Sequence, residues 1–172
     1  MVYQFCRQSP HTDVVLSSHG RFVGAASRPF SEYKRKPGER VGLNWRVTNN
    51  LGKRSIRHVL FDTNFWKSFI QARLGVAQGD PECLSLFEEF PESHRLFAEH
   101  RTSEYRIRTE GRGRTVDEWK IRPEQADNHW FDGVVGCAVA AAVQGCVLFG
   151  TDGNVARPTA RVRLSALKGK KR

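Results

Sequence analysis

Residues 56–74 read IRHVLFDTNFWKSFIQARL, and this stretch decides the fold class. Its first part, up to Asp62, is a near-continuous apolar run, which is typical of a strand buried inside a sheet. After Asp62 the apolar residues recur at helical spacing, so one face packs and Lys67 faces outward. The apolar positions are Phe65, Phe69, Ala72 and Val76. We expect this helix to stop near Gly79. A buried strand that continues directly into a helix predicts an α/β domain.

Short β-like segments precede this unit. VYQFC at residues 2–6 and VVLSS at residues 14–18 are separated by a polar turn and predict a hairpin. Residues 24–40, GAASRPFSEYKRKPGER, are rich in Gly, Pro, Lys and Arg and suit an exposed loop with a basic face. GLNWRVTNN at residues 42–50 predicts a further strand.

The C-terminal half predicts two helices and a two-stranded ribbon. SHRLFAEHRTSE at residues 93–104 suits a short helix with Leu96 and Phe97 inward. Residues 104–122 alternate around the turn EGRGR, the pattern of an antiparallel ribbon. DNHWFDGVVGCAVAAAVQG at residues 127–145 then predicts a helix that begins with polar residues and continues with small apolar ones.

Length and charge limit the possible functions. With 172 residues, of which 39% are hydrophobic, the chain can form one ordinary core. We therefore expect one domain over residues 1–150 and a flexible basic tail over residues 151–172. The formal net charge of +10, from 28 Lys and Arg against 18 Asp and Glu, favours a polyanionic partner such as nucleic acid. We expect no membrane attachment, because the start lacks a signal-peptide pattern and the run 134–143 is too short to span a bilayer.

The cysteines indicate a reducing compartment rather than a metal site. The four are widely spaced, and the chain has no CxxC pair and no histidine at zinc-finger spacing, which argues against structural zinc. Cys137 and Cys146 lie in the apolar helical segment, where we expect them to be small buried hydrophobes. Free thiols fit a cytoplasmic protein better than disulfides do.

Carboxylates on two separate elements are candidates for helix capping or for metal binding. Asp127 and Asn128 are good helix caps, and Asp62 could likewise cap the helix that follows it. His129 and Asp132 stand three apart and share one helical face. Asp132 lies near the face that must pack, so it should have a charged or metal partner. Two carboxylates on separate elements of a basic α/β domain suggest divalent cations bound over a phosphate backbone, as in two-metal nucleases.

Three segments together resemble a known family. VYQFCR, LFDTNFWKSFIQARL and HRTSEYRIRTEGRGRTVDEWKIRPEQADNHWFDGVVGCAVAA are similar to the C-terminal nuclease domain of phage terminase large subunits of the lambda type, over residues 2–148. The resemblance implies a ribonuclease-H-like fold, a mixed sheet flanked by helices, with acidic residues that bind two Mg²⁺ or Mn²⁺ ions. It implies cleavage of concatemeric double-stranded DNA at the start and end of genome packaging. The implied partners are the terminase small subunit, the portal and an ATPase motor domain.

The motifs assign roles to particular residues. By resemblance, Asp62 in FDTN matches the strand-end acid and Asp132 in HWFD matches the late-helix acid, so both are expected to be catalytic and to bind metal. Asp127 and His129 flank the second motif as further metal or water contacts. Glu104 in TSEY also belongs to the resembling segments, where we expect it at the surface without an assigned role.

The family pattern also contains an Asp-Ser-Gly-like motif with another catalytic aspartate, upstream of the segment that matches VYQFC. Met1 stands just past that point, and the chain resembles the downstream part of a terminase gene. We therefore expect this chain to bind DNA but to cut it slowly or not at all, and an upstream extension to restore cutting.

Basic side chains are expected to hold the phosphate backbone. They lie in the loop, on the helix after Asp62 and at the tip of the ribbon. The expected DNA-binding residues are Lys34, Arg35, Lys36, Arg40, Lys67, Arg112 and Arg114. Two alternatives remain open at this point: a DNA-binding or assembly module that does not cut, and a small basic RNA-binding protein, which would present exposed aromatic residues to single-stranded bases.

Overall fold

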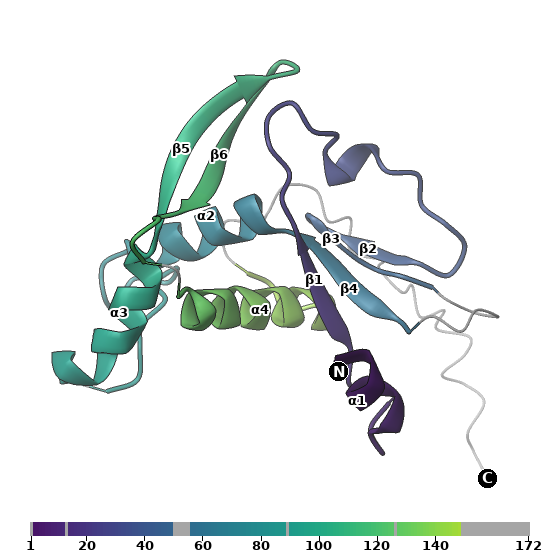
Figure 1. The fold of residues 1–172 in the computed structure, drawn as a ribbon, viewed down its shortest axis with the longest axis horizontal. Helices are drawn as coiled ribbons and strands as arrows, with labels where there is room; N and C mark the ends of the chain where they lie inside the picture. Colours follow the sequence, from purple (N-terminus) through teal and green to yellow (C-terminus); the bar gives the residue numbers. More distant parts are fainter. Residues whose placement is uncertain (1, 13, 50–55, 89, 126, 149–172) are drawn as a thin grey trace, which may run out of the picture.

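A mixed β-sheet forms one layer of the protein (Figure 1). The computed structural model describes residues 2–12, 14–49, 56–88, 90–125 and 127–148. The four strands lie in the order β1-β4-β3-β2. Their bounds are β1 Ser17–Arg21, β2 Arg40–Gly42, β3 Trp45–Val47 and β4 His58–Asp62. β1 runs parallel to β4, whereas β3 is antiparallel to both β4 and β2.

Two long helices pack side by side against one face of this sheet (Figure 1). They are α2, Thr63–Leu74, and α4, His129–Gln144. Trp66 of α2 and Phe131 of α4 are completely buried between the helices and the sheet. The rest of the core consists of Trp45, Val47, Val59, Phe61, Ile70, Trp119, Val135, Val139 and Val143. The predicted α/β class, a mixed sheet flanked by helices, is confirmed, and the arrangement is consistent with a ribonuclease-H-like fold.

The ribbon forms a second, two-stranded sheet that rises from α2 (Figure 1). β5, Glu104–Gly111, pairs in antiparallel register with β6, Arg114–Ile121, as predicted. Arg112 and Gly113 form a two-residue turn with φ of 51° and 69°. Positive φ at both positions is the requirement of the hairpin turn that matches strand twist, and a glycine meets it without strain.

Shorter elements complete the structure. η1, Phe30–Glu32, lies in the loop between β1 and β2, and η2, Pro91–His94, leads into α3, Arg95–Thr102. The helix predicted over residues 93–104 is therefore confirmed. Its expected packing is wrong in part, because Leu96 is exposed.

The predicted N-terminal hairpin is wrong. Residues Val2–Gln8 form a helix, α1, and β1 begins at Ser17 and pairs with β4 instead of with an upstream strand. VYQFC has apolar residues that satisfy helical as well as alternating spacing, so five residues could not decide between the two. The helix α2 also ends earlier than expected, because Gly75 rather than Gly79 follows its last turn.

The cysteines are free thiols, as expected, but their burial differs from the prediction. Cys6 is buried, whereas Cys137 and Cys146 are exposed. Cys137 lies on α4 but is not one of its buried residues, and Cys146 follows the end of the helix. Within the described ranges, no helix is long and apolar enough to cross a membrane. The tail predicted over residues 151–172 lies outside the described residues.

Candidate functional site

Asp62 ends strand β4 and caps helix α2. Its Oδ1 accepts hydrogen bonds from the backbone N–H groups of Asn64, at 3.0 Å, and Phe65, at 3.2 Å. Burial raises the pKa of the Asp62 carboxyl to about 6, although the two backbone hydrogen bonds and the positive charge of Arg114 act in the opposite direction. The capping alternative is therefore correct for Asp62, and the carboxyl is also perturbed in the way that functional carboxyls often are.

A cavity of 290 Å³ adjoins Asp62, between the start of α2 and the ribbon. Its charged lining residues are Asp62, Arg108, Arg114 and Asp117. Asp117 lies 3.2 Å from Arg106 and 3.8 Å from Arg108, measured between carboxylate oxygen and guanidinium nitrogen. The Asp62 carboxyl thus borders a polar space that a charged ligand could enter.

Asp132 belongs to a second polar cluster, centred on Lys67. The Nζ of Lys67 lies 2.5 Å from Oε1 of Glu104 and 2.9 Å from Oδ1 of Asp132. The side chains of Lys67 and Glu104 are 9% and 2% exposed, whereas that of Asp132 is 51% exposed. Asn128 donates from Nδ2 to the same Glu104 oxygen at 2.5 Å. We call these four residues the Lys67 cluster.

The surface position expected for Lys67 and Glu104 is wrong. The ribbon covers the face of α2 that carries Lys67, and Glu104 stands at the start of β5 over that face. A buried ammonium requires a partner, and Glu104 and Asp132 provide two. The expectation that Asp132 has a charged partner is confirmed, and that partner is Lys67.

Asn64 holds the ribbon in place over α2. Its Oδ1 accepts a hydrogen bond from the backbone N–H of Trp119 at 2.9 Å, and its Nδ2 donates to the carbonyl of Val23 at 3.2 Å. Asn64, Lys67 and Gln71 are three and four residues apart and therefore lie on one stripe of the helix. This stripe fixes β6 against α2, and the pairing of β6 with β5 then brings Glu104 to Lys67.

The structure does not show Asp62 and Asp132 in contact. Lys67, which binds Asp132, is five residues from Asp62, a rise of about 7.5 Å along the helix. In residues 2–12, 14–49, 56–88, 90–125 and 127–148, no group of three or more His, Cys, Asp or Glu side chains is placed to hold a metal ion. The expected approach of Asp62 and Asp132 across two metal ions stays a prediction.

The donor chemistry of the Lys67 cluster nevertheless fits a hard divalent cation. Carboxylate oxygens of Glu104 and Asp132 converge on one positive charge, the ammonium of Lys67. Mg²⁺ and Mn²⁺ prefer oxygen ligands of this kind. Glu104 and Asp132 would supply part of the ligand shell of one such ion.

Asp127 and His129 lie outside the Lys67 cluster. Both are exposed, and Oδ1 of Asp127 lies 3.7 Å from Nε2 of His129. The helix α4 begins with Asn128 as its N-cap residue, whose side chain makes no capping hydrogen bond, so the predicted capping role of Asp127 is wrong. The Asn128 amide is bound to Glu104 instead. The proposed metal contacts of Asp127 and His129 stay predictions.

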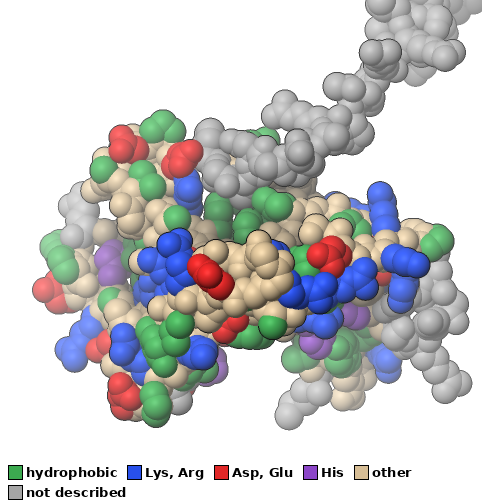
Figure 2. Space-filling model, turned by 90° about the horizontal axis from the view of Figure 1, so that it is seen from above, with side chains coloured by type: hydrophobic (Ala, Val, Ile, Leu, Met, Phe, Trp, Pro, Cys, Tyr) green, Lys and Arg blue, Asp and Glu red, His purple; other side chains and the backbone are tan. Residues whose placement is uncertain are grey.

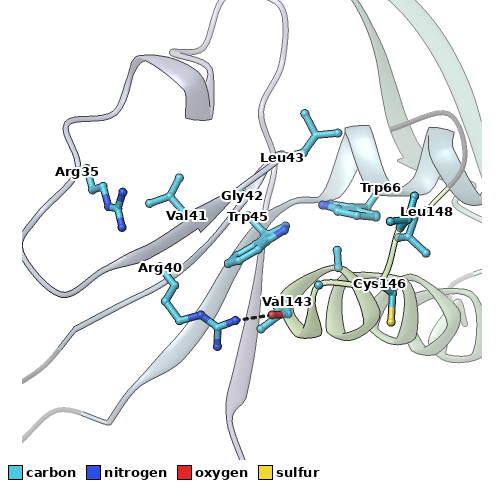
Figure 3. A pocket seen from close by; sticks show the side chains of 13 residues that line it. Arg35, Arg40, Val41, Gly42, Leu43, Trp45, Trp66, Val143, Cys146 and Leu148 are labelled. Atoms are coloured by element: carbon cyan, nitrogen blue, oxygen red, sulfur yellow. Dashed lines mark hydrogen bonds between the residues drawn. The ribbon is translucent and has the colours of Figure 1, made fainter. Parts of the chain in front are cut away.

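The basic residues of the loop are exposed, and two of them are also anchored by hydrogen bonds. Lys34, Arg35 and Lys36 are exposed, and Nε of Arg35 donates to the carbonyl of Glu39 at 3.1 Å. Arg40 donates to the carbonyl of Val143 at 2.5 Å, at the C-terminal end of α4 (Figure 3). A cation there complements the helix dipole, so Arg40 links β2 to α4.

Figure 3 also shows a cavity of 470 Å³ between β2, β3 and the end of α4. Its lining is apolar at Trp45, Trp66 and Leu148 and basic at Arg35 and Arg40, and no carboxylate is among the described residues that line it. The cavity therefore offers no carboxylate ligand to a divalent cation.

The two arginines expected at the ribbon tip have different environments. Arg112 is exposed in the turn, 3.9 Å from a carboxylate oxygen of Glu32. Arg114 directly follows the turn and pairs with Gly111, so its expected place at the tip is confirmed. It is partly buried and donates to the backbone carbonyls of Gly24, Ala25 and Ser27, which holds the loop against the ribbon. DNA contacts by these residues stay predictions.

Figure 2 looks down on the ribbon tip and the loop between β1 and β2. Lys and Arg side chains gather on this face, with several Asp and Glu side chains among them. The exposed basic residues of the loop and ribbon are Arg28, Lys34, Arg35, Lys36, Arg106, Arg108, Arg112 and Lys120. The face suits a polyanion that lies across both elements.

Sequence reasoning missed the roles of three residues. Glu104 and Asn128 complete the Lys67 cluster, and Arg101 packs its guanidinium against the rings of Trp119 and Phe131, 4.9 Å from each ring centroid. Burial lowers the pKa of the Arg101 guanidinium and is the largest of the effects on that pKa. The sequence holds one signal for Glu104, its position at the start of an alternating strand, and that signal alone does not indicate burial.

The fold and the carboxylates on β4, β5 and α4 define the protein as a mixed α/β domain of the kind found in nucleases. Over residues 1–148 the chain matches a family described as the endonuclease domain of the terminase large subunit gpA, and it belongs to that family. The family expected from the sequence is thereby confirmed. No curated protein and no solved structure matches the chain.

Proposed function

We propose that this chain is a divalent-metal-dependent endonuclease domain that acts on double-stranded DNA. The observation that carries the proposal is the Lys67 cluster, in which Glu104 and Asp132 direct carboxylate oxygens at one cation. The family supports an endonuclease role, and the net charge of +10 supports a polyanionic substrate.

The carboxylates have environments that suit different tasks. Asp132 is half exposed, so its second oxygen can reach a ligand at the surface, whereas Glu104 is buried and held in one orientation by Lys67 and Asn128. Asp62, with a pKa of about 6, is ionised at pH 8 and basic enough to accept a proton from water. A metal ion bound by Glu104 and Asp132 would polarise the phosphate and lower the pKa of a bound water.

The biological setting is proposed on the family alone. A terminase endonuclease domain would cut concatemeric DNA during genome packaging, together with the terminase small subunit, the portal and an ATPase motor domain. Mg²⁺ or Mn²⁺ is the proposed cofactor, because the available ligands are carboxylate oxygens.

One alternative has a structural observation in its favour. The described carboxylates form no group of three, and Lys67 already pairs with both Glu104 and Asp132. A domain in this state would bind DNA through its basic face without cutting it. The structure leaves the RNA-binding alternative open. Trp45, Trp66 and Trp119 are buried and cannot stack on bases, whereas Trp130, Phe87 and Phe90 are exposed. The family match favours DNA over RNA as the substrate.

Metal binding and plasmid nicking test the proposal together. Mn²⁺ binding is measured by electron paramagnetic resonance, and conversion of supercoiled plasmid to the nicked form is measured at saturating Mg²⁺ or Mn²⁺. Asp132→Asn and Glu104→Gln should each abolish Mn²⁺ binding and nicking. Asp80→Asn is the matched control, since Asp80 is an exposed aspartate outside the site.

Two outcomes would count against cutting by this domain. A plasmid that stays supercoiled although the chain binds DNA would favour the non-cutting alternative. Nicking that persists in Asp132→Asn at the level of the Asp80→Asn control would remove the Lys67 cluster from the mechanism.

A further inference from the structure

A separate cavity lies at the base of the ribbon, beside the Lys67 cluster. It has a volume of 260 Å³ and is bounded by α2, the end of α3 and the two ribbon strands. Three of its lining residues are arginines, Arg101, Arg106 and Arg122, and Glu104 is its carboxylate. Gln71 and Thr102 contribute neutral polar groups to the same wall. The positive charge of this cavity exceeds its negative charge.

Arg101 is the most unusual of the three arginines. Its guanidinium lies 4.9 Å from the ring centroids of both Trp119 and Phe131, so its position is fixed by two core aromatics. The described part of the chain offers this guanidinium no hydrogen bond or ion pair, and the negative charge that acts on it is the Glu104 carboxylate. A partly buried guanidinium with unused donors is a pre-positioned site for an anion.

Arg122 is held in a similar way. Its Nε donates to the carbonyl of Thr102 at 3.1 Å, and its guanidinium lies 5.2 Å from the centroid of the Tyr105 ring. These contacts orient the side chain without neutralising it. Arg106, in contrast, is paired with Asp117 at 3.2 Å.

Glu104 offsets only part of the positive charge. Its carboxylate accepts hydrogen bonds from Lys67 and Asn128, each at 2.5 Å. The one positive charge of Lys67 is shared by Glu104 and Asp132, so that cluster carries one net negative charge. Within the described residues, Arg101 and Arg122 have no bonded carboxylate, and their two positive charges exceed this negative charge.

We propose that this cavity is a phosphate-binding site, formed by Arg101 and Arg122, that holds a phosphate of the nucleic-acid backbone next to the Lys67 cluster. Paired guanidinium groups match the geometry of a phosphate and bind it through charge-assisted hydrogen bonds. The proposal rests on the proposed function only in naming DNA as the source of the phosphate. Glu104 belongs to both the cavity and the Lys67 cluster. A phosphate bound in the cavity would therefore fix the distance of its DNA strand from the carboxylates of the Lys67 cluster.

Duplex binding in EDTA tests the site without any cutting. A fluorescent duplex of mixed sequence is titrated at several salt concentrations with the full chain, Arg101→Gln, Arg122→Gln and Arg95→Gln. Arg101→Gln and Arg122→Gln should each weaken binding about tenfold at moderate salt and reduce the salt slope by about 1, the loss of one phosphate contact. Arg95→Gln removes one charge from the same helix α3, and it should weaken binding less than about twofold, since Arg95 is highly exposed and lies outside the cavity.

The choice of variants separates a loss of DNA binding from a loss of folding. The stem of Arg101 packs on the core and its loss could unfold the domain, whereas Arg122 is exposed, so Arg122→Gln tests the site in a folded protein. Arg101→Lys keeps the charge but not the planar fork and should give an intermediate affinity. Duplex affinities of Arg101→Gln and Arg122→Gln equal to that of Arg95→Gln would overturn the proposal.

A second experiment tests whether the bound phosphate belongs to DNA or to a small compound. Inorganic phosphate is titrated while the Nε–Hε resonances of the arginines are followed by NMR. Shifts of the Arg101 and Arg122 resonances, together with the loss of duplex affinity in the variants, support a backbone phosphate. Shifts without any loss of duplex affinity would overturn DNA as the source and indicate a small phosphate compound. The duplex titration is done in EDTA, so its result does not depend on cutting. Absence of nicking in the separate assay with Mg²⁺ or Mn²⁺ would count against the proposed function and leave this result unaffected.

Discussion

Replacing Asp62 by Asn should stabilise the protein at neutral pH and much less at acid pH. Asn keeps the Oδ1 acceptor that receives the N–H groups of Asn64 and Phe65, and it is as good an N-cap as Asp. It has no charge to bury. The stability difference between the two proteins therefore reports the free energy of ionising Asp62 in its buried position.

The sign and size follow from the pKa. Burial raises the pKa of Asp62 from 3.8 to about 6, so the native state binds the proton more tightly than the unfolded state does. The free energy of unfolding contributed by this group is therefore fully present below pH 3.8 and is lost as the pH rises toward 6. The linkage relation gives a cost of about 1 kcal/mol at pH 4.5 and about 3 kcal/mol at pH 7.5, as an upper limit.

Urea unfolding of both proteins at the two pH values measures this difference. Asp62→Asn should gain about 2 kcal/mol over the parent protein between pH 4.5 and pH 7.5. Asp62→Ala lacks the cap acceptor and should be about 1 kcal/mol less stable than Asp62→Asn at both pH values. A stability difference that does not change with pH, or an Asn variant that is less stable at pH 7.5, would refute the reasoning about burial.

Two further substitutions test the structure around the site. Lys67→Met should lower the free energy of unfolding by about 3–5 kcal/mol, because it leaves the buried Glu104 carboxylate without its charged partner. Lys67→Met combined with Glu104→Leu should recover most of that loss in urea unfolding, and equal instability of the single and double variants would contradict the pairing. Asn64→Ala should cost about 2 kcal/mol, since it leaves the N–H of Trp119 without its buried acceptor, and thermal unfolding monitored by tryptophan fluorescence measures the change.

The fold was predictable from the sequence where long periodic segments exist. The apolar run ending at Asp62, the helix after it and the alternating ribbon each contain enough residues to specify one period. α1 and β1 were not predictable. SSHGR in β1 is almost entirely exposed and polar, so its strand conformation comes from pairing with β4 and not from its own pattern.

The candidate site was predictable in part. Sequence and resemblance indicated Asp62 and Asp132, but the contact between Lys67 and Glu104 depends on how the ribbon crosses α2. That crossing is fixed by the hydrogen bonds of Asn64, whose partners Val23 and Trp119 are 41 and 55 residues away in the chain. No local pattern encodes contacts at such separations, so Lys67 and Glu104 read as surface residues although they are buried.

The arrangement around α2 is better explained by function than by stability. A buried ion pair such as Lys67–Glu104 is often no more stable than apolar residues of similar volume. Asp62 is buried with a raised pKa, and Arg101 is partly buried without a bonded anion, and both conditions cost free energy in the unbound protein. A ligand that brings negative charge to Arg101 and positive charge to the carboxylates would relieve these costs together. A phosphate backbone accompanied by a divalent cation has this distribution of charge, and each element of it can be tested by a single substitution named above.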